Sequence, residues 1–249
     1  MKRMSRTFGW ILALSLPLAP PAGAAPQLAV AYTPQNEPPY ALTKNGELES
    51  GLIHDIAVDL ADRLHRSPSF VLLSRNRIES ALVDGTADLY CGYNPAWASA
   101  PERLRWSPPL WTERDVFVLR AGSPPVIDWP DLRGRRIGTI LGYRYTPALE
   151  SMFAAGAATR DDTQSVESNL ERLDRGWVDV AVASEVVLRY QAGSNPALPK
   201  FDVAALTESS NKIYCATADR VELPADAVTA AFTAMLADGS IDRILARYQ

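Results

Sequence analysis

One strand–helix pattern occurs twice in this chain, and it limits the fold more than any other feature of the sequence. Residues 82–88 have the order Leu-x-x-Gly-x-x-Asp, and residues 173–179 repeat that order 91 positions later. In both places the pattern is typical of a helix end, a glycine cap and the start of a buried strand. Any helix–strand junction can match it by chance. The repetition nevertheless predicts two lobes of similar α/β architecture.

Strands and helices are predicted to alternate over most of the chain. The expected strands cover residues 27–32, 70–73, 87–92, 136–140 and 178–183. An apolar stripe with helical spacing predicts a helix over 53–64. Further helices are expected near 78–85, from 147, from 166, over 225–236 and over 241–248. Short connections between alternating strands and helices favour parallel sheets. Residues 115–125 and 209–216 are expected to cross between the lobes as a hinge.

The first 24 residues have the pattern of a secretory signal peptide. Lys2, Arg3 and Arg6 precede an apolar run over residues 8–18, and small residues follow at 22–24. This run is shorter than the roughly 18 residues that a membrane span requires, which disfavours an anchor. We expect cleavage after residue 24 and export to the periplasm. No cysteine stands directly after the cleavage site, which argues against a lipid anchor.

Charge and composition exclude several classes of function. The chain is 47% hydrophobic and 22% charged, as is usual for a globular protein, so disorder is disfavoured. Its formal charge of −4 becomes about −7 when the three basic residues of the signal peptide are removed. Nucleic acids and membrane surfaces attract basic proteins, and neither is expected as a partner. Residues 25–249 are enough for two lobes.

The cysteines and histidines are too few for a metal cage. Cys91 and Cys215 are the two cysteines, and in an oxidising compartment an even count favours a disulfide. The alternative is a pair of buried free thiols. His54 and His65 do not form a cluster with the cysteines, so no metal site is expected. Hydrolase, zinc-protease, phosphate-loop and dinucleotide motifs are absent, so neither a cofactor nor a catalytic residue is predicted.

The candidate site follows from sheet topology. Ligands bind beyond the carboxyl ends of parallel strands, where loops and helix N-termini gather. The loop at Gly142 is informative because Thr146 and Pro147 have the pattern of a helix start, whose free amides suit an anion. Residues beyond the strand ends are Glu37, Tyr40, Arg75, Gly92, Tyr93, Asn94, Gly142, Tyr143, Arg144, Ser184 and Glu185.

Five segments of the chain resemble the periplasmic solute-binding proteins of ABC importers, in particular family 3, whose members bind polar amino acids. The segments are EPPY at 37–40, GLIHDIAVDLADRL at 51–64, ALVDGTADL at 81–89, PERLRWSPPL at 101–110 and DLRGRRIG at 131–138. The resemblance implies a type II two-lobe α/β fold, in which each lobe is a mostly parallel sheet flanked by helices, with a two-strand hinge. It implies lobe 1 at 25–115 plus 214–249 and lobe 2 at 116–213. It also implies a monomer that delivers a solute to a membrane permease.

The resemblance assigns roles to individual residues. The arginine that clamps a ligand carboxylate in the family corresponds to Arg103, and Asn94 takes the place of a serine or threonine that assists it. Arg75 replaces an aromatic residue that stacks on the ligand. Ser184 replaces the aspartate that holds the ligand ammonium, and the loss of an ion pair there is worth roughly 1.5–3 kcal/mol.

These departures from the family pattern lead to a hypothesis about the ligand. Because Arg75, Arg103 and Arg144 are all predicted near the cleft, an organic anion is an alternative to an amino acid. An enzyme related to cyclohexadienyl dehydratases is a second alternative, but the acid of those enzymes corresponds to Val187. A periplasmic partner of an oxidoreductase is a third.

Overall fold

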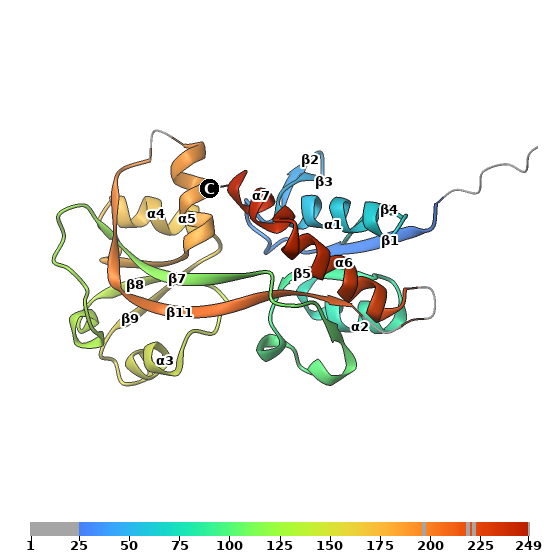
Figure 1. The fold of residues 1–249 in the computed structure, drawn as a ribbon. Coiled ribbons are helices and arrows are strands. Elements are labelled where there is room, and N and C mark those ends of the chain that lie inside the picture. Colours follow the sequence, from blue (N-terminus) through green and yellow to red (C-terminus); the bar gives the residue numbers. More distant parts are fainter. Residues whose placement is uncertain (1–24, 196–197, 218–219, 221–222, 249) are drawn as a thin grey trace, which may run out of the picture.

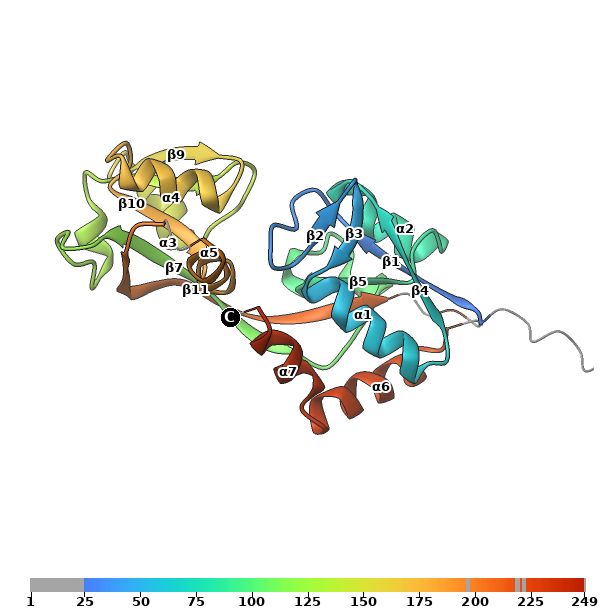
Figure 2. The same ribbon diagram turned by 90° about the horizontal axis from the view of Figure 1, so that it is seen from above.

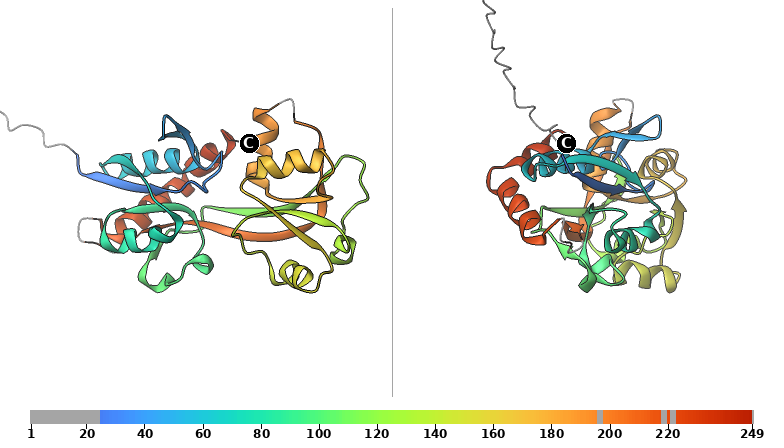
Figure 3. Two further views of the ribbon diagram at one scale, coloured as in Figure 1. Left: turned by 180° about the vertical axis from the view of Figure 1, so that it is seen from behind. Right: turned by 90° about the vertical axis from the view of Figure 1, so that its right-hand side faces the viewer.

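The computed structural model describes residues 25–195, 198–217, 220 and 223–248, so the expected signal peptide lies outside the described residues. The chain forms two lobes, and β7 and β11 run between them (Figures 1 and 3). Within the described residues, no helix combines the length and apolar character needed to cross a membrane.

Lobe 1 contains the first and last parts of the described chain. Its sheet has the order β4-β1-β5-β11, with β6 also paired to β11, and a β2–β3 hairpin lies apart from it. Its strands are β1 (Gln27–Tyr32), β2 (Leu42–Lys44), β3 (Glu47–Ser50), β4 (Ser67–Leu72), β5 (Leu89–Tyr93) and β6 (Arg105–Trp106). Its helices are α1 (Leu52–Arg63), α2 (Ile78–Asp84), α6 (Ala225–Ala237) and α7 (Ser240–Ala246).

Lobe 2 contains the middle of the chain. Its sheet has the order β11-β7-β10-β8-β9, in which β8 is parallel to both β9 and β10. Its strands are β7 (Trp111–Arg120), β8 (Arg136–Ile140), β9 (Thr159–Thr163), β10 (Val180–Ser184) and β11 (Phe201–Thr217). Its helices are α3 (Pro147–Ala154), α4 (Val166–Asp174) and α5 (Glu185–Ser194).

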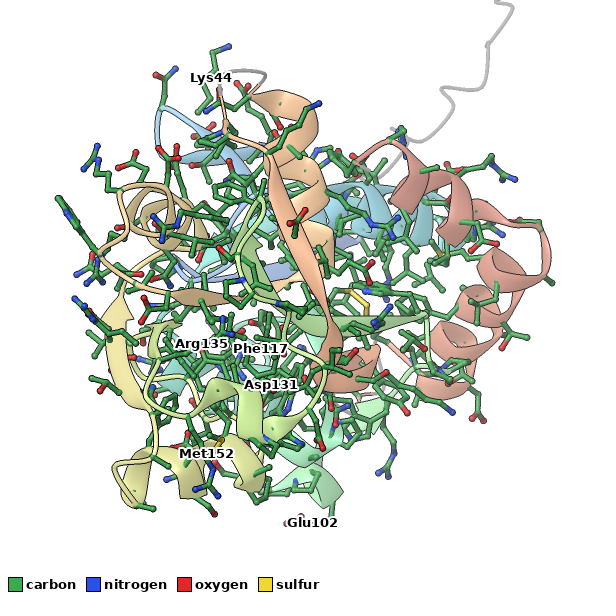
Figure 4. All side chains as sticks on the ribbon, turned by 90° about the vertical axis from the view of Figure 1, so that its left-hand side faces the viewer. Lys44, Glu102, Phe117, Asp131, Arg135 and Met152 are labelled. Carbon is green, nitrogen blue, oxygen red and sulfur yellow. A yellow bond between two sulfur atoms is a disulfide. The ribbon has the colours of Figure 1, made fainter. Side chains whose placement is uncertain are left out.

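Strand β11 belongs to both sheets. It pairs with β7 from Phe201 to Ile213 and with β5 from Tyr214 to Thr217. The exchange of partners falls between Ile213 and Tyr214. β7 and β11 therefore form an antiparallel ribbon that connects the lobes. A disulfide joins Cys91 to Cys215, which face each other on β5 and β11 with Cα atoms 4.0 Å apart. Figure 4 shows this bridge as a yellow bond.

Helices cover both faces of each sheet. In lobe 1 one buried cluster lies under α1, α6 and α7, and a second lies under α2. In lobe 2 one cluster lies under α4 and α5, and another lies under α3. The apolar stripe expected over 53–64 is confirmed, because Ile53, Ile56 and Leu60 are fully buried. Burial of such stripes is the main force that stabilises each lobe.

The repeated pattern has one structural role in both lobes. Asp88 accepts a hydrogen bond from the backbone N–H of Ala29 at 2.8 Å, and Asp179 accepts one from the backbone N–H of Arg136, also at 2.8 Å. In each case the aspartate joins the start of a strand to a neighbouring strand. The glycines before them, Gly85 and Gly176, have φ angles of 82° and 72°, which favour glycine.

Candidate functional site

Three carboxylates lie where the ribbon enters lobe 2. Glu113 and Asp115 occupy alternate positions of β7 and therefore share one face of the strand. Glu208 lies on β11, which pairs with β7 there. Glu113 is 9% exposed and Glu208 is 4% exposed, while Asp115 is partly buried. We call these three residues the acidic cluster.

Each carboxylate of the acidic cluster accepts a hydrogen bond from an uncharged group. Ser184, the last residue of β10, donates its hydroxyl hydrogen to Oε1 of Glu113. Ser209 donates to Asp115 at 2.8 Å. The backbone N–H of Thr146, at the start of α3, donates to Oε1 of Glu208 at 2.6 Å. The bonds of Ser184 and Thr146 connect the ribbon to β10 and to the start of α3, whereas the Ser209 bond lies within the ribbon.

Among the described residues, no basic side chain pairs with a carboxylate of the acidic cluster. Within the described residues, none of its members forms an ion pair. Arg114, the basic residue between Glu113 and Asp115, lies near Glu185 instead, with 3.7 Å between nitrogen and oxygen. The described part of the chain therefore supplies no cation that would balance the cluster in its ionised form. Buried charges usually have a partner of opposite sign, so such a partner is missing here.

Burial shifts the pKa values of two members of the cluster. Burial raises the pKa of Glu113 to about 8, with a further upward contribution from the charge of Asp115, while the Ser184 hydrogen bond acts in the opposite direction. Burial likewise raises the pKa of Asp115 to about 6, with Glu208 adding to the shift. A cation bound beside these groups would favour their ionised forms.

Tyr143 extends the site across the space between the lobes. It lies in the loop after β8 and is 55% exposed, yet burial raises the pKa of its hydroxyl, as do the charges of Asp115 and Glu113. Arg75 of lobe 1 lowers the pKa of the same hydroxyl. Tyr143 is thus within electrostatic reach of both the cluster and lobe 1.

Aromatic contacts hold Arg75 in lobe 1. Its guanidinium lies over the ring of Tyr93 at 4.7 Å and donates to the hydroxyl of Tyr90 at 3.2 Å. Tyr93 in turn donates to Glu79 at 3.0 Å. Gly92, between these tyrosines, has a φ of 80°, and a Cβ there would lie 3.2 Å from the ring of Tyr40. Arg75 is therefore held against the side chains of Tyr90 and Tyr93.

Several other predicted residues have different local contacts. Asn94 donates to the carbonyl of Lys212 at 2.7 Å and accepts from the N–H of Ala96 at 2.8 Å, so its side chain holds the backbone. Glu185 pairs with Arg189 on α5 at 2.8 Å. The side chains of Arg103 and Arg144 are exposed and make no hydrogen bond or ion pair within the described residues, and Gly142 is an exposed turn residue with a φ of 81°.

Glu37 makes a contact between the lobes. Its carboxylate accepts a hydrogen bond from the backbone N–H of Val166, the first residue of α4, at 3.0 Å for one oxygen and 3.3 Å for the other. Tyr40, in the same loop, packs against clusters of both lobes. Figure 2 shows this loop, which follows β1, facing the second lobe.

The structure brings Ser184, Tyr143 and Arg75 toward one region, but the acidic cluster at its base was not predicted from the sequence. The search for strand ends overlooked Glu113 and Asp115, because they lie in the first half of a strand. A usable signal existed: charged residues alternate at 113 and 115 just before the apolar residues of β7. In the described part of the chain, no group of three or more histidine, cysteine or acidic side chains has the geometry of a metal site.

Sequence and structure comparisons identify the family. The model for bacterial extracellular solute-binding proteins, family 3, matches residues 28–249. The chain belongs to this family. No curated protein matches the sequence.

Solved structures agree with the family 3 fold. An ancestral arginine-binding protein bound to arginine has 20% identity and a TM-score of 0.69, with 89% of this chain and 97% of the other covered. The L-cystine solute receptor of Neisseria gonorrhoeae, unliganded and open, has 15% identity and a TM-score of 0.66, with 90% and 93% covered. Substrate-binding domain 2 of Lactococcus lactis GlnP, also open, has 15% identity and a TM-score of 0.67, with 93% and 98% covered. The similarity to these solved structures shows the two-lobe fold, and the three similar proteins are binding proteins.

Proposed function

We propose that the chain is an extracytoplasmic binding protein that closes its two lobes on a small polar solute and delivers it to an ABC importer. The family match over residues 28–249 and the ribbon between the lobes support this proposal. After removal of residues 1–24, the protein would act as a monomer in the periplasm. Solute binding would shift the balance between open and closed forms, and the permease would recognise the closed form.

The acidic cluster supports a solute that carries a positive group. Glu113 is buried and hydrogen-bonded to Ser184, and it belongs to a cluster that has no basic partner among the described residues. The hypothesis of an organic anion depended on three arginines. Two of them, Arg103 and Arg144, are exposed without polar contacts in the described structure, and Arg75 is held over Tyr93. The buried groups at the base of the site are acidic, and in their ionised forms they favour an ammonium or guanidinium group.

An amino acid satisfies both sides of the proposed site. Its ammonium would lie beside Glu113 and Asp115, while its carboxylate would be within reach of Arg75 on the opposite lobe. A guanidinium suits a carboxylate because it presents two parallel donors. An organic acid without a positive group would leave the cluster uncompensated and would add like charge.

A thermal-shift screen tests this proposal. We would compare amino acids and amines with organic acids of similar size, because a ligand at 100 times its Kd stabilises the folded form by about 2.7 kcal/mol. Solutes with an ammonium or guanidinium group should raise the melting temperature. Stabilisation by organic acids alone would contradict the cationic solute, and no stabilisation by any class would count against small-solute binding.

Binding rather than catalysis fits the local structure. The resemblance would place the acid of a cyclohexadienyl dehydratase at residue 187, where this chain has a valine that is 4% exposed and packs in a core cluster. An aliphatic side chain at that position supplies no proton. We therefore propose binding without chemical conversion of the solute.

A further inference from the structure

The contact between Glu37 and α4 is a direct polar bond between the two lobes. Glu37 follows β1 in lobe 1, whereas α4 belongs to lobe 2. Ser165 accepts from the N–H of Ser168 at 3.1 Å, so it caps its own helix. The N–H of Val166 instead takes its acceptor from Glu37 at 3.0 Å. The start of α4 is thus completed by a side chain that is 129 positions away in sequence.

The loop of lobe 1 holds Glu37 in place before the lobes meet. The side chain of Asn36 accepts from the N–H of Thr33 at 2.7 Å and from its hydroxyl at 3.0 Å. The carbonyl of Glu37 accepts from the N–H of Tyr40 at 2.8 Å. These bonds hold the backbone of the loop, so closure has to fix only the side-chain rotamers of Glu37.

Helix geometry makes the start of α4 a favourable partner for a carboxylate. The first amides of a helix have no acceptor within the helix, and the N-terminus carries a partial positive charge. Val166 is 5% exposed, so its N–H is poorly placed to find water when the lobes are together. Without Glu37, closure would bury a donor that has lost its acceptor, which costs free energy.

We infer that Glu37 and the N-terminus of α4 form an interlobe latch that stabilises the lobe arrangement of this structure, which we take as the closed form, before any solute is bound. The latch sets the ratio of closed to open molecules in the ligand-free protein. It does not depend on the identity of the solute or on the acidic cluster. Packing of Val186 against the lobe 1 core, and of Tyr190 against Tyr248 at 6.4 Å between ring centres, accompanies the latch.

Substitutions at Glu37 separate the acceptor from the charge. Glu37→Ala removes the acceptor, and we expect the ratio of closed to open molecules to fall about tenfold, the effect of one lost hydrogen bond. Glu37→Gln keeps an acceptor oxygen without the charge, and it should remain as closed as the native protein. Glu47→Ala is the matched control, because Glu47 lies exposed on the β2–β3 hairpin of the same lobe.

The experiment measures the distance between lobes without ligand. Fluorescent labels would be attached to cysteines introduced at Lys44 and Asp174, which are exposed on lobes 1 and 2; Lys44 extends from the edge of the molecule in Figure 4. Single-molecule energy transfer in purified, solute-free protein then counts the two populations. Circular dichroism checks that each variant folds, and Glu37→Gln keeps the test informative if the alanine variant does not.

Two results would overturn the latch. One is a Glu37→Ala protein with the same two populations as the native protein and the Glu47→Ala control. The other is a Glu37→Gln protein that opens as far as Glu37→Ala. Either outcome would leave the proposed solute binding standing, because the thermal-shift screen on the native protein tests that proposal separately.

Discussion

The Glu113 carboxylate accepts a hydrogen bond from Ser184, and this contact places a buried acidic group beside residue 184. The family resemblance expects an ammonium-binding aspartate at residue 184, on β10. Here that residue is a serine, and the adjacent strand β7 supplies the carboxylate. Charge is retained in the neighbourhood even though it is absent from the expected position.

Glu113→Gln tests whether this carboxylate binds the positive group of the solute. The change preserves the size of the side chain and removes its charge. We expect the affinity for a solute with an ammonium group to fall about 10- to 100-fold, which corresponds to roughly 1.5–3 kcal/mol. Isothermal titration calorimetry measures the change, with Glu47→Gln as the control. An unchanged Kd would exclude Glu113 from the solute contact.

Solute affinity should depend on pH through Glu113. Burial raises the pKa of this group to about 8, so in the ligand-free protein it holds a proton over much of the neutral range. A bound cation favours the ionised form, and binding therefore releases that proton. Affinity should rise as the pH increases from 6 to about 8 and then level off. Titrations in buffers of different ionisation enthalpy count the proton, and Glu113→Gln should abolish its release.

Closure of the lobes should take up a proton at Glu37. Burial raises the pKa of this carboxyl above its ordinary value of 4.5, and Glu167 on α4 adds to the rise, whereas the Val166 hydrogen bond lowers it. The hollow of about 550 Å³ beside the loop has no other charged lining residue. Because the closed form binds the proton more tightly, its population should be greatest below pH 4.5. It should fall as the pH rises through the raised pKa.

The labelled protein used for the latch also measures this pH dependence. Glu37→Ala has no carboxyl to titrate and should show a flat profile over the same range. A native protein whose closed population grows with rising pH would contradict the assignment to Glu37.

Gly92→Ala should destabilise the protein more than Gly122→Ala. The two glycines have φ angles of 80° and 77°, so both substitutions strain the backbone by a similar amount, about 1–2 kcal/mol. At Gly92 the new Cβ would also lie 3.2 Å from the Tyr40 ring, whereas at Gly122 it meets nothing within 4 Å. Urea unfolding of both variants isolates the contribution of this contact. Equal losses would mean that Tyr40 moves aside without cost.

Reduction of the disulfide should lower stability. The bridge between Cys91 and Cys215 closes a loop of 124 residues, for which the chain-entropy account gives about 4–5 kcal/mol. Urea unfolding with and without reductant measures the difference. A variant with serine at both positions should resemble the reduced protein and should not respond to reductant. Both cysteines lie in the lobe 1 sheet, so hinge motion should persist.

Much of the fold was predictable because its signals are local. The helix starts at 147 and 166 were placed correctly, since proline after threonine and serine before an apolar stripe are start signals that need no tertiary partner. The β2–β3 hairpin, strands β6 and β9 and helix α5 were missed. β9 is rich in charged residues, and its Asp161 and Asp162 gain ion pairs with Arg172 and Arg160 only after the sheet has formed.

The site was less predictable because its contacts join distant residues. Glu113 meets Ser184 across 71 positions, and Glu37 meets Val166 across 129. Glu37 belongs to the EPPY segment, but neither it nor Glu113 reveals its partner in the sequence, and a glutamate in a strand or a loop is usually solvated. The arginines that suggested an anion were visible in the sequence, but their exposure was not. Burial decides which charges act strongly, and burial is a property of the folded chain.

By itself the sequence determined the alternation of strands and helices, their caps and the twofold pattern that ends in Asp88 and Asp179, because periodicity and capping depend on neighbours a few residues away. The tertiary structure alone decided that Glu113, Asp115 and Glu208 come together without a basic partner in the described chain, and that Glu37 completes a helix in the other lobe. Those outcomes depend on how two sheets share the β7–β11 ribbon, and no local pattern encodes the distance between residues that the ribbon brings together.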